Sequence, residues 1–344
     1  MLGLELAYWQ ESILRSLGIL AAVLLPAGTF VYVFLFKMVS FMQSRLGPME
    51  AGPYGSMQLL AEVGKFLQKE DLVPDRADRT LFKVAPYLVV GTVLLTYLVV
   101  PFGPDMVFID NDVFGTGIFF ALAVGSISVI GVIVAGWASA SKYSLLGALR
   151  GAGQLIAYEL PLVLSVVGVV IQTGSLDLQR MVVAQAEGEI FGFGGLGNPF
   201  FLTQIIGLFI FLIAMQAELA QTPFDMPVAE SELVAGYMTE YTGLRFLLFF
   251  IGEFASAGAL SAIAATMFLG GWWLPGLDLD ANYMNVVGPV VLLAKMMIFG
   301  GLIFFVRFTY PRFREDQLQR FAWKVLIPLA LVNITATGIL KVVF

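Results

Sequence analysis

Eight apolar runs of membrane-spanning length constrain the fold of this chain more than any other feature. They cover residues 16–36, 84–101, 114–138, 147–171, 201–218, 244–269, 286–307 and 325–343. A helix needs about 20 mostly apolar residues to cross a bilayer, and a helix satisfies its own backbone hydrogen bonds in lipid. Only 13% of the 344 residues are charged. We therefore predict one all-α polytopic membrane domain over 1–344, with about eight transmembrane helices.

The distribution of Lys and Arg predicts how these helices are oriented. Fifteen of the nineteen basic residues lie in the connectors that follow spans one, three, five and seven. These connectors are 37–83, 139–150, 219–245 and 307–324. Basic connectors stay on the cytoplasmic side. We therefore expect these four segments to be cytoplasmic and, with an even number of spans, both termini to lie on the outer face.

A short cytoplasmic segment, 53–69, has helical periodicity but is too short to span the membrane. Its apolar residues fall on one face and its charged residues on the other. The apolar set is Leu59, Leu60, Val63, Phe66 and Leu67, and the charged set is Glu62, Lys65 and Lys69. This pattern predicts an amphipathic helix. Such a helix lies at the membrane surface, or it serves as a docking face or a portal for an apolar ligand.

The composition excludes several kinds of site. The chain has no Cys and no His, so it forms no disulfide, no Cys-held iron–sulfur cluster and no zinc site of the Cys/His type. We predict no metal site and no redox centre in this chain. Its net charge of −6 argues against binding to nucleic acid.

The connector between spans five and six is unusually acidic. Residues 218–241 read ELAQTPFDMPVAESELVAGYMTEY and contain no Lys or Arg. Two prolines, Pro223 and Pro227, interrupt helical continuity, and we expect a second short helix to begin near Val228. The acids alternate with apolar residues, so we expect the segment to be buried. Its carboxylates are Glu218, Asp225, Glu230, Glu232 and Glu240. Clustered carboxylates in poor solvation hold protons and are able to pass them on. The alternative is an exposed acidic loop.

Three further charged residues, Glu159, Glu253 and Lys295, lie inside predicted spans. Charges at this depth are costly and generally mark ion or proton paths. The alternative is a structural ion pair between Lys295 and one of the two acids.

Four stretches of the sequence resemble one known family. They are AELAQTPFDMPVAESELVAGYMTEYTGLRF, QSRLGPMEAGPYG, LRGAGQLIAYELPL and RFTYPRFREDQLQRFAWKVLIPL. Together they resemble the ND-one-type membrane subunit of respiratory complex I, which is the H subunit of the bacterial proton-translocating NADH-quinone oxidoreductase. The resemblance covers most of the chain, and the predicted number of helices agrees with it.

The resemblance implies a role at the joint between the hydrophilic arm and the membrane arm. The implied proton and coupling path uses Glu159, Glu218, Asp225, Glu230, Glu232 and Glu253. The implied quinone cavity side involves Gln43, Arg45 and Arg307, with Arg312 and Arg314 facing the hydrophilic arm. The four cytoplasmic connectors would form the docking face for that arm.

The resemblance also implies partners and a location. The chain would bind no cofactor of its own and take quinone, such as ubiquinone, as substrate. FMN and iron–sulfur clusters would belong to partner subunits. Those partners would be the other membrane-arm subunits and the iron–sulfur and quinone-site subunits of the hydrophilic arm, with membrane lipids around them. The location would be a bacterial plasma membrane, with a mitochondrial inner membrane as the alternative.

Some positions depart from the family pattern. Phe36, Lys37 and Met38 replace a usual Glu-Arg-Lys, Met49 and Glu50 follow Gly-Pro in place of Asn-Arg, and Met238 replaces a His. These departures bear on the lining of the quinone cavity. Two other functions remain open: the anchor subunit of a related membrane-bound hydrogenase or ferredoxin- or coenzyme-dependent complex, and a free-standing transporter. The lack of an internal repeat argues against the transporter.

Overall fold

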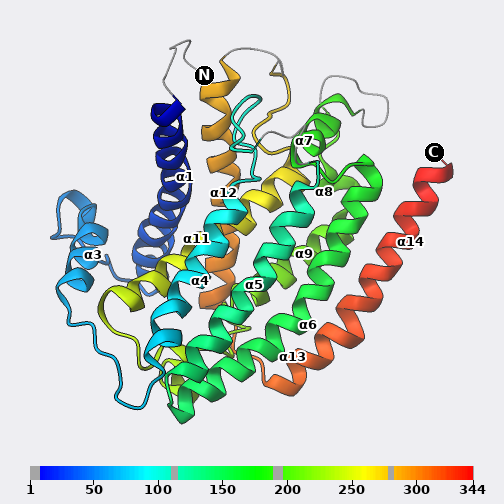
Figure 1. Ribbon diagram of the computed structural model, residues 1–344. Coiled ribbons are helices and arrows are strands. Elements are labelled where there is room, and N and C mark those ends of the chain that lie inside the picture. The colour runs from blue at the N-terminus through cyan, green and yellow to red at the C-terminus, as the bar shows by residue number, and fades with distance from the viewer. Residues whose placement is uncertain (1–7, 110–114, 189–196, 278–282, 344) are drawn as a thin grey trace.

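The computed structural model describes residues 8–109, 115–188, 197–277 and 283–343 as a tilted bundle of helices (Figure 1). Within these ranges every regular element is helical. Seven helical segments are long and apolar enough to cross a membrane: Ile13–Met42, Arg79–Tyr97, Gly117–Ala138, Lys142–Thr173, Gly243–Leu269, Met284–Thr309 and Glu315–Val343. A shorter apolar helix covers Ile205–Glu218. The predicted all-α polytopic fold is confirmed.

The long segments carry the following labels. The first contains α1 (Tyr8–Phe30), a π-helical stretch (Val31–Met38) and α2 (Val39–Met42). Then come α4 (Arg79–Tyr97), α5 (Gly117–Ala138), α6 (Lys142–Thr173), α11 (Gly243–Leu269) and α12 (Met284–Thr309). The last contains α13 (Glu315–Phe321), a second π-helical stretch (Ala322–Leu326) and α14 (Ile327–Val343).

The fifth predicted span differs from the expectation because it is broken near its start. It consists of α8 (Phe200–Thr203) and α9 (Ile205–Glu218), with Gln204 between them in a non-helical conformation. The Gln204 side chain accepts a hydrogen bond from Asn333 Nδ2 at 3.0 Å and donates one to Thr337 Oγ1 at 2.9 Å. Both partners belong to α14. A buried amide is thereby satisfied, and α9 itself has only 14 residues.

Two helices extend beyond their predicted spans at the basic end of the bundle. The helix predicted over 147–171 begins at Lys142, and α12 continues to Thr309. The polypeptide between α5 and α6 is therefore only 139–141, and α13 begins after residues 310–314. In Figure 1, α1 begins and α14 ends toward the top, whereas α6 and α13 begin near the bottom. We refer to the bottom as the basic end and to the top as the far end.

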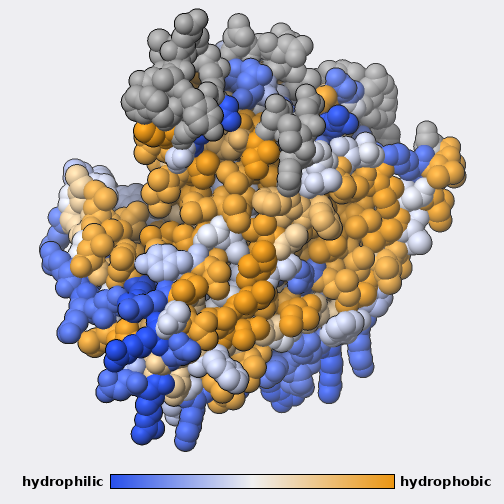
Figure 2. Space-filling model, viewed as in Figure 1, coloured by the Kyte–Doolittle hydropathy of each residue, from blue (hydrophilic) through white to orange (hydrophobic). Residues whose placement is uncertain are grey.

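Aromatic packing joins the π-helical stretch after α1 to α11 and α12. The rings of Phe34 and Phe304 stack with centroids 5.5 Å apart, and those of Phe254 and Phe304 stack at 5.7 Å. Figure 2 shows apolar side chains across the middle of the visible face and hydrophilic ones gathered at the basic end. This distribution is expected for a protein that spans a bilayer.

The predicted amphipathic helix is present as a short 3₁₀ turn (Pro53–Gly55) followed by α3 (Gln58–Gln68). It packs beside α11, where Phe66 stacks on Phe246 with centroids 5.5 Å apart. Leu60 and Leu67 remain more than 60% exposed. An amphipathic helix with exposed leucines is suited to contact with lipid or with an apolar ligand.

Candidate functional site

The acidic connector folds back at the basic end after α9 ends at Glu218. It contains only a four-residue helix, α10 (Glu230–Leu233), and a 3₁₀ turn (Gly236–Met238). Gly236 has φ of +55°, and a Cβ there would lie 1.7 Å from the carbonyl oxygen of Pro227. Only glycine fits this close approach. The predicted break in the helix and the short helix near Val228 are both confirmed.

The expectation that this connector is buried is correct for only some of its acids. Glu218 Oε2 is buried, and Asp225 has 18% of its side chain exposed. Glu230 and Glu232 are exposed, with 51% of the Glu232 side chain accessible. The cause is the orientation of α10, which buries Leu233 and turns both glutamates outward.

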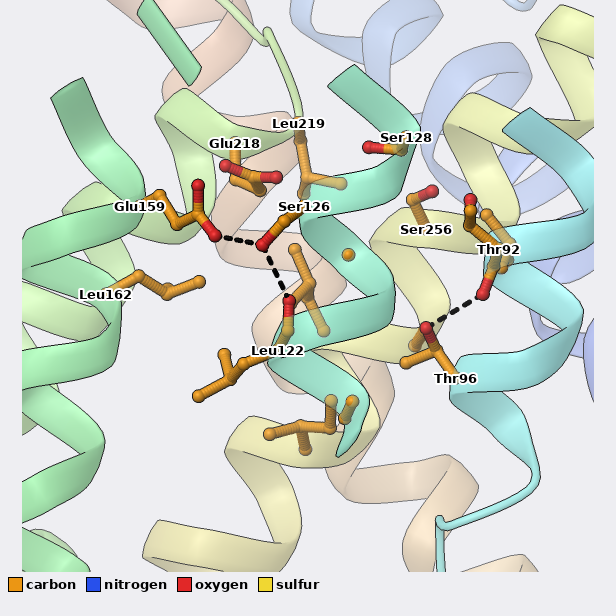
Figure 3. A pocket seen from close by; sticks show the side chains of 16 residues that line it. Thr92, Thr96, Leu122, Ser126, Ser128, Glu159, Leu162, Glu218, Leu219 and Ser256 are labelled. Carbon is orange, nitrogen blue, oxygen red and sulfur yellow. Dashed lines mark hydrogen bonds between the residues drawn. The ribbon is translucent and has the colours of Figure 1, made fainter. Parts of the chain in front are cut away.

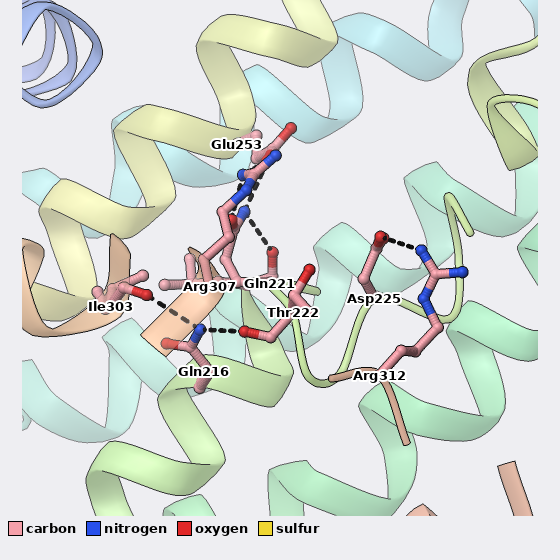
Figure 4. A network of polar contacts seen from close by, with 9 residues as sticks. Gln216, Gln221, Thr222, Asp225, Glu253, Ile303, Arg307 and Arg312 are labelled. Atoms are coloured by element: carbon pink, nitrogen blue, oxygen red, sulfur yellow. Dashed lines mark hydrogen bonds and ion pairs between the residues drawn. The ribbon is translucent and has the colours of Figure 1, made fainter. Parts of the chain in front are cut away.

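Arg307, at the end of α12, links the acidic connector to α11 (Figure 4). Its Nη1 lies 3.3 Å from Glu253 Oε1 and also donates a short hydrogen bond to Gln221 Oε1. Gln221 Nε2 in turn donates to Glu253 Oε1 at 2.6 Å. The side chains of Arg307 and Glu253 are 28% and 24% exposed. The three residues form a closed ring of one cation, one anion and one amide.

A second arginine holds Asp225. Arg312 Nη2 donates to Asp225 Oδ2 at 2.8 Å, and Arg312 Nη1 donates to Ser231 Oγ at 3.0 Å (Figure 4). Burial raises the pKa of Asp225 above its usual range, and the positive charges of Arg312 and Arg307 oppose that rise. The protonation of Asp225 therefore depends on where these two arginines lie.

Tyr237 is a further polar group near Asp225 and Glu253. Burial raises the pKa of its phenol, and the negative charges of Glu253 and Asp225 raise it further. Tyr237 thus stays a neutral hydroxyl between two acids at any physiological pH. We call Gln221, Asp225, Tyr237, Glu253, Arg307 and Arg312 the arginine network.

Glu232 is paired with an arginine at the surface. Arg150 Nη1 of α6 lies 2.5 Å from Glu232 Oε2, and Arg150 Nε lies 3.9 Å from Glu315 Oε2 of α13. Exposed pairs of this kind contribute at most about 1 kcal/mol. They tie α10 to two helices without burying charge.

The second part of the site is a cavity inside the bundle, which we call the membrane cavity (Figure 3). Its volume is about 70 Å³. Its polar lining comes from four long helices and from the end of α9: Thr92, Thr96, Ser126, Ser128, Glu159, Glu218 and Ser256. Because one water needs roughly 10–15 Å³ of such space, the cavity has room for a few waters in contact with oxygen atoms.

The two carboxylates face this cavity from neighbouring helices (Figure 3). Ser126 Oγ donates a short hydrogen bond to Glu159 Oε1, and the same hydroxyl lies 3.1 Å from the carbonyl oxygen of Leu122. Glu218 Oε2 is buried and has no hydrogen-bond partner among the described residues. A buried carboxyl oxygen without a protein partner, next to a polar cavity, is placed to bond to water.

Lys295 forms no ion pair with Glu159 or Glu253 in the described residues, so the alternative interpretation, a structural ion pair, is wrong. Its Nζ donates to the carbonyl oxygens of Leu269, at 2.6 Å, and Trp273, at 2.5 Å. These are the last carbonyls of α11 and the turn that follows. A cation is stabilised at a helix C-terminus by the helix dipole, so Lys295 needs no acid.

Of the three residues predicted for the quinone side, Gln43 and Arg45 contact each other, whereas Arg307 binds elsewhere. Gln43 Oε1 accepts a hydrogen bond from Arg45 Nε at 2.8 Å in an exposed turn after α2. Arg307 lies in the arginine network. The nearby Lys37 donates to the carbonyl oxygen of Pro48 at 2.7 Å. This bond joins the π-helical stretch to the loop that contains the departures at 49 and 50.

The structure also adds residues that the sequence reasoning missed. Gln221 bridges Glu253 and Arg307, and Ser126 bonds to Glu159. The available signal was weak, because each is an uncharged polar residue within or beside an apolar run. Their partners are distant in sequence, so only the fold reveals the contact.

The fold and the site together define a class. The chain is an integral membrane protein whose bundle encloses a carboxylate-lined cavity next to a network of arginines and acids. A family model described as NADH dehydrogenase matches residues 14–338. The chain belongs to this family.

Curated relatives agree over nearly the whole chain. The NADH-quinone oxidoreductase H subunit of Brevibacillus brevis is 43% identical over 321 residues, which is 93% of this chain and 90% of the relative. The NADH-quinone oxidoreductase H subunit 2 of Syntrophobacter fumaroxidans is 42% identical, covering 95% of each chain. The H subunit from Thermomicrobium roseum is 41% identical, covering 97% of each. The resemblance seen in the acidic connector is confirmed.

Proposed function

We propose that this chain acts as the H subunit of a proton-translocating NADH-quinone oxidoreductase. In that complex it forms the membrane side of the quinone cavity and the first acidic groups of the path that couples quinone reduction to proton movement. Membership in the family supports the assignment to this complex. The observation that carries the coupling role is the placement of partly buried acids in two sets, one at the basic end and one in the membrane.

Helix α11 supports a connection between the two sets. Glu253 belongs to the arginine network, and Ser256, three residues further along α11, lines the membrane cavity. Three residues correspond to about 4.5 Å of helix. On the connector side, Gln221 follows Glu218 by three residues and bonds to Glu253. Two short links therefore join the network to the cavity.

A coupling mechanism follows from the charges. Quinone reduction consumes two protons and places negative charge near the quinone until they arrive. Negative charge at the basic end attracts Arg307 and Arg312 and weakens their hold on Glu253 and Asp225. Each carboxylate then binds a proton more readily, because a partner cation is what favours its charged form. When the arginines return, the proton is released to the next acceptor.

The membrane cavity supplies that acceptor. Glu218 and Glu159 face the same space, and Ser126 is bonded to Glu159. Waters in this space would bridge the two carboxyl groups. Glu230 and Glu232 would exchange protons with the basic-end surface or with the docked hydrophilic arm. In this proposal Gln43 and Arg45 face the quinone from the exposed turn after α2.

The partners follow from the same assignment. FMN and the iron–sulfur clusters would lie in subunits of the hydrophilic arm, and that arm would dock on the four basic connectors. Other membrane-arm subunits would pack on the apolar sides of the bundle. The organisms of the relatives point to a bacterial plasma membrane as the location.

The test compares two neutralised acids in the assembled complex. We expect Glu218→Gln and Asp225→Asn to lower the ratio of protons moved to electrons transferred, measured in membrane vesicles supplied with NADH and a quinone. Glu187→Gln, an exposed glutamate at the far end of the bundle, is the control and should leave the ratio unchanged. Normal quinone reduction with a normal ratio in both acid variants would refute the proposed path.

A further inference from the structure

Lys295 is a buried cation that the proposed path does not use. It is 8% exposed and lies in the interior of α12. Within the described chain, its hydrogen-bond partners are two backbone carbonyls and it forms no ion pair. A charged group at this depth is expensive to bury, and such groups generally serve ion pathways. The question is what a cation contributes at this position.

The position of Lys295 relative to the membrane cavity can be followed along α11. The membrane cavity reaches Ile263 on α11, and Lys295 binds the carbonyl oxygen of Leu269, six residues further toward the far end. Six residues correspond to about 9 Å of helix. Residues 264–268 between them are all buried. Lys295 therefore sits beyond the end of the cavity, on the side away from the arginine network.

The packing around Lys295 closes the far end of α11. Trp273, whose carbonyl oxygen accepts from Lys295, is buried and donates from its indole nitrogen to the carbonyl oxygen of Leu277 at 3.2 Å. Gln185 of α7 (Leu178–Glu187) donates to the carbonyl oxygen of Thr266 at 2.8 Å. The described polar groups here bond to one another and to the backbone, and Lys295 is the charged member of this set.

We propose that Lys295 is an electrostatic barrier that keeps protons in the membrane cavity from leaking to the far end of the bundle. This inference rests on the proposed function, because a barrier matters only if the cavity holds mobile protons. A fixed positive charge repels an excess proton that approaches through water, as positive groups do in pores that exclude protons. The acids of the cavity thus communicate with the basic end, where the arginine network controls them.

The size of the barrier follows from the distance. A full charge at about 9 Å, in an effective dielectric constant near 20, slows proton passage by a factor of about 20. The C-terminal dipole of α11 offsets roughly half a charge, which reduces the factor to about 5. We therefore expect neutralisation of Lys295 to raise proton leakage about 5- to 20-fold.

A helix cap is the competing explanation, and the choice of variants separates it from a barrier. Lys295→Gln keeps a donor for the carbonyl oxygens but removes the charge. Lys295→Arg keeps the charge and several donors. Lys295→Met removes both and matches the length of the lysine stem. A barrier predicts that Gln and Met both leak and that Arg does not, whereas a cap predicts defects that follow the lost donor.

The experiment measures passive leakage, so it does not depend on turnover. Membrane vesicles that contain the assembled complex receive an acid pulse in the absence of NADH, and the decay of the pH gradient is followed with a trapped indicator. Assembly is checked by electron transfer from NADH to a soluble acceptor. We expect a 5- to 20-fold faster decay in Lys295→Gln and Lys295→Met, with Lys295→Arg close to the parent protein.

A second variant tests the route of the leak. Adding Glu218→Gln to Lys295→Gln should slow the leak again, because the protons then lack an acceptor in the cavity. The barrier is ruled out if Lys295→Gln is as tight as the parent, if Arg leaks as much as Gln, or if only Arg permits assembly. A leak that persists in the double variant refutes the route through the cavity. A normal proton-to-electron ratio in both Glu218→Gln and Asp225→Asn, each made without a change at Lys295, would instead overturn the proposed path.

Discussion

The pair formed by Asp225 and Arg312 provides a quantitative test of the arginine network. The perturbations are Asp225→Asn, Arg312→Gln and the two together. The atoms are 2.8 Å apart, and the side chains are 18% and 24% exposed. Removing one member of a fully buried pair costs about 3–5 kcal/mol, whereas a surface pair is worth at most about 1. For a pair that is about four-fifths buried we expect a cost of about 1–3 kcal/mol for each single change.

The two single changes should not cost the same. Loss of Arg312 leaves a buried carboxylate that retains Arg307 as its remaining positive neighbour. Loss of Asp225 leaves a guanidinium that keeps its bond to Ser231. Arg312→Gln should therefore be the more damaging change. The double variant should be no worse than Arg312→Gln alone, since neutral Asn no longer needs the missing cation.

The assay is the rate of thermal inactivation of the assembled complex in its membrane, because large membrane assemblies lose activity irreversibly. A cost of 1–3 kcal/mol, if realised in the barrier to inactivation, corresponds to rates about 5- to 150-fold faster. Arg314→Gln is the matched control in the same connector, since the Arg314 side chain is 76% exposed and pairs with Asp316 at the surface. It should stay within about twofold of the parent. Single effects that multiply in the double variant would show that the pair does not interact.

The pH dependence of the Arg312→Gln penalty provides an independent check on this prediction. Burial raises the pKa of Asp225 and Arg312 lowers it, so Arg312→Gln raises that pKa further. A carboxyl whose pKa is raised in the folded state is favourable while protonated and becomes unfavourable as pH increases through that pKa. The penalty of Arg312→Gln should therefore shrink as the medium is made more acidic. A penalty that grew on acidification would contradict the assignment of Asp225 as the group left unpaired.

Four further substitutions test the local structure by the same inactivation assay. Gly236→Ala places a Cβ 1.7 Å from the Pro227 carbonyl oxygen at a φ of +55° and should lower stability by at least about 2 kcal/mol. Its control is Gly64→Ala in α3, where the added Cβ meets open space. This control should be neutral or raise stability by up to about 1 kcal/mol. Tyr158→Phe removes a buried 3.0 Å hydrogen bond to a backbone carbonyl of α13 and should cost about 1–3 kcal/mol; an unchanged rate would mean that water replaces the hydroxyl. Glu232→Gln breaks only a half-exposed ion pair and should change stability by less than about 1 kcal/mol, so a large loss would show that α10 is buried in the complex.

The sequence was sufficient for features that depend on local pattern. Apolar length located the membrane helices, because the bilayer sets the required length. Two prolines located the break after α9, and periodicity located α3. The extra break at Gln204 was not predictable from the same signals. It exists because Gln204 is satisfied by Asn333 and Thr337, and those contacts form only when α14 packs beside α9.

At the site, too, local features were predictable and contacts between distant residues were not. Sequence identified the acids, because a carboxylate in an apolar segment is conspicuous. It did not identify their partners, because Arg307 and Arg312 lie more than fifty residues further along the chain than Glu253 and Asp225. The burial of the acidic connector was overestimated for the same reason. Composition indicated an apolar segment but could not show that α10 turns Glu230 and Glu232 outward.

The acids of the connector are therefore not equivalent, and their partners explain why. Glu232, whose side chain is half exposed, pairs with Arg150 of α6. Asp225 and Glu253 are partly buried, and each pairs with one arginine. Because Arg312 opposes the rise in the pKa of Asp225, a small movement of Arg312 changes the affinity of Asp225 for protons. Glu218 has a buried oxygen with no partner among the described residues, so water in the cavity is what remains to bond with it. Between Asp225 and Glu218 the partner of the acid thus changes from an arginine to water. Directed proton transfer through this protein would require such a graded change in the surroundings of successive acids.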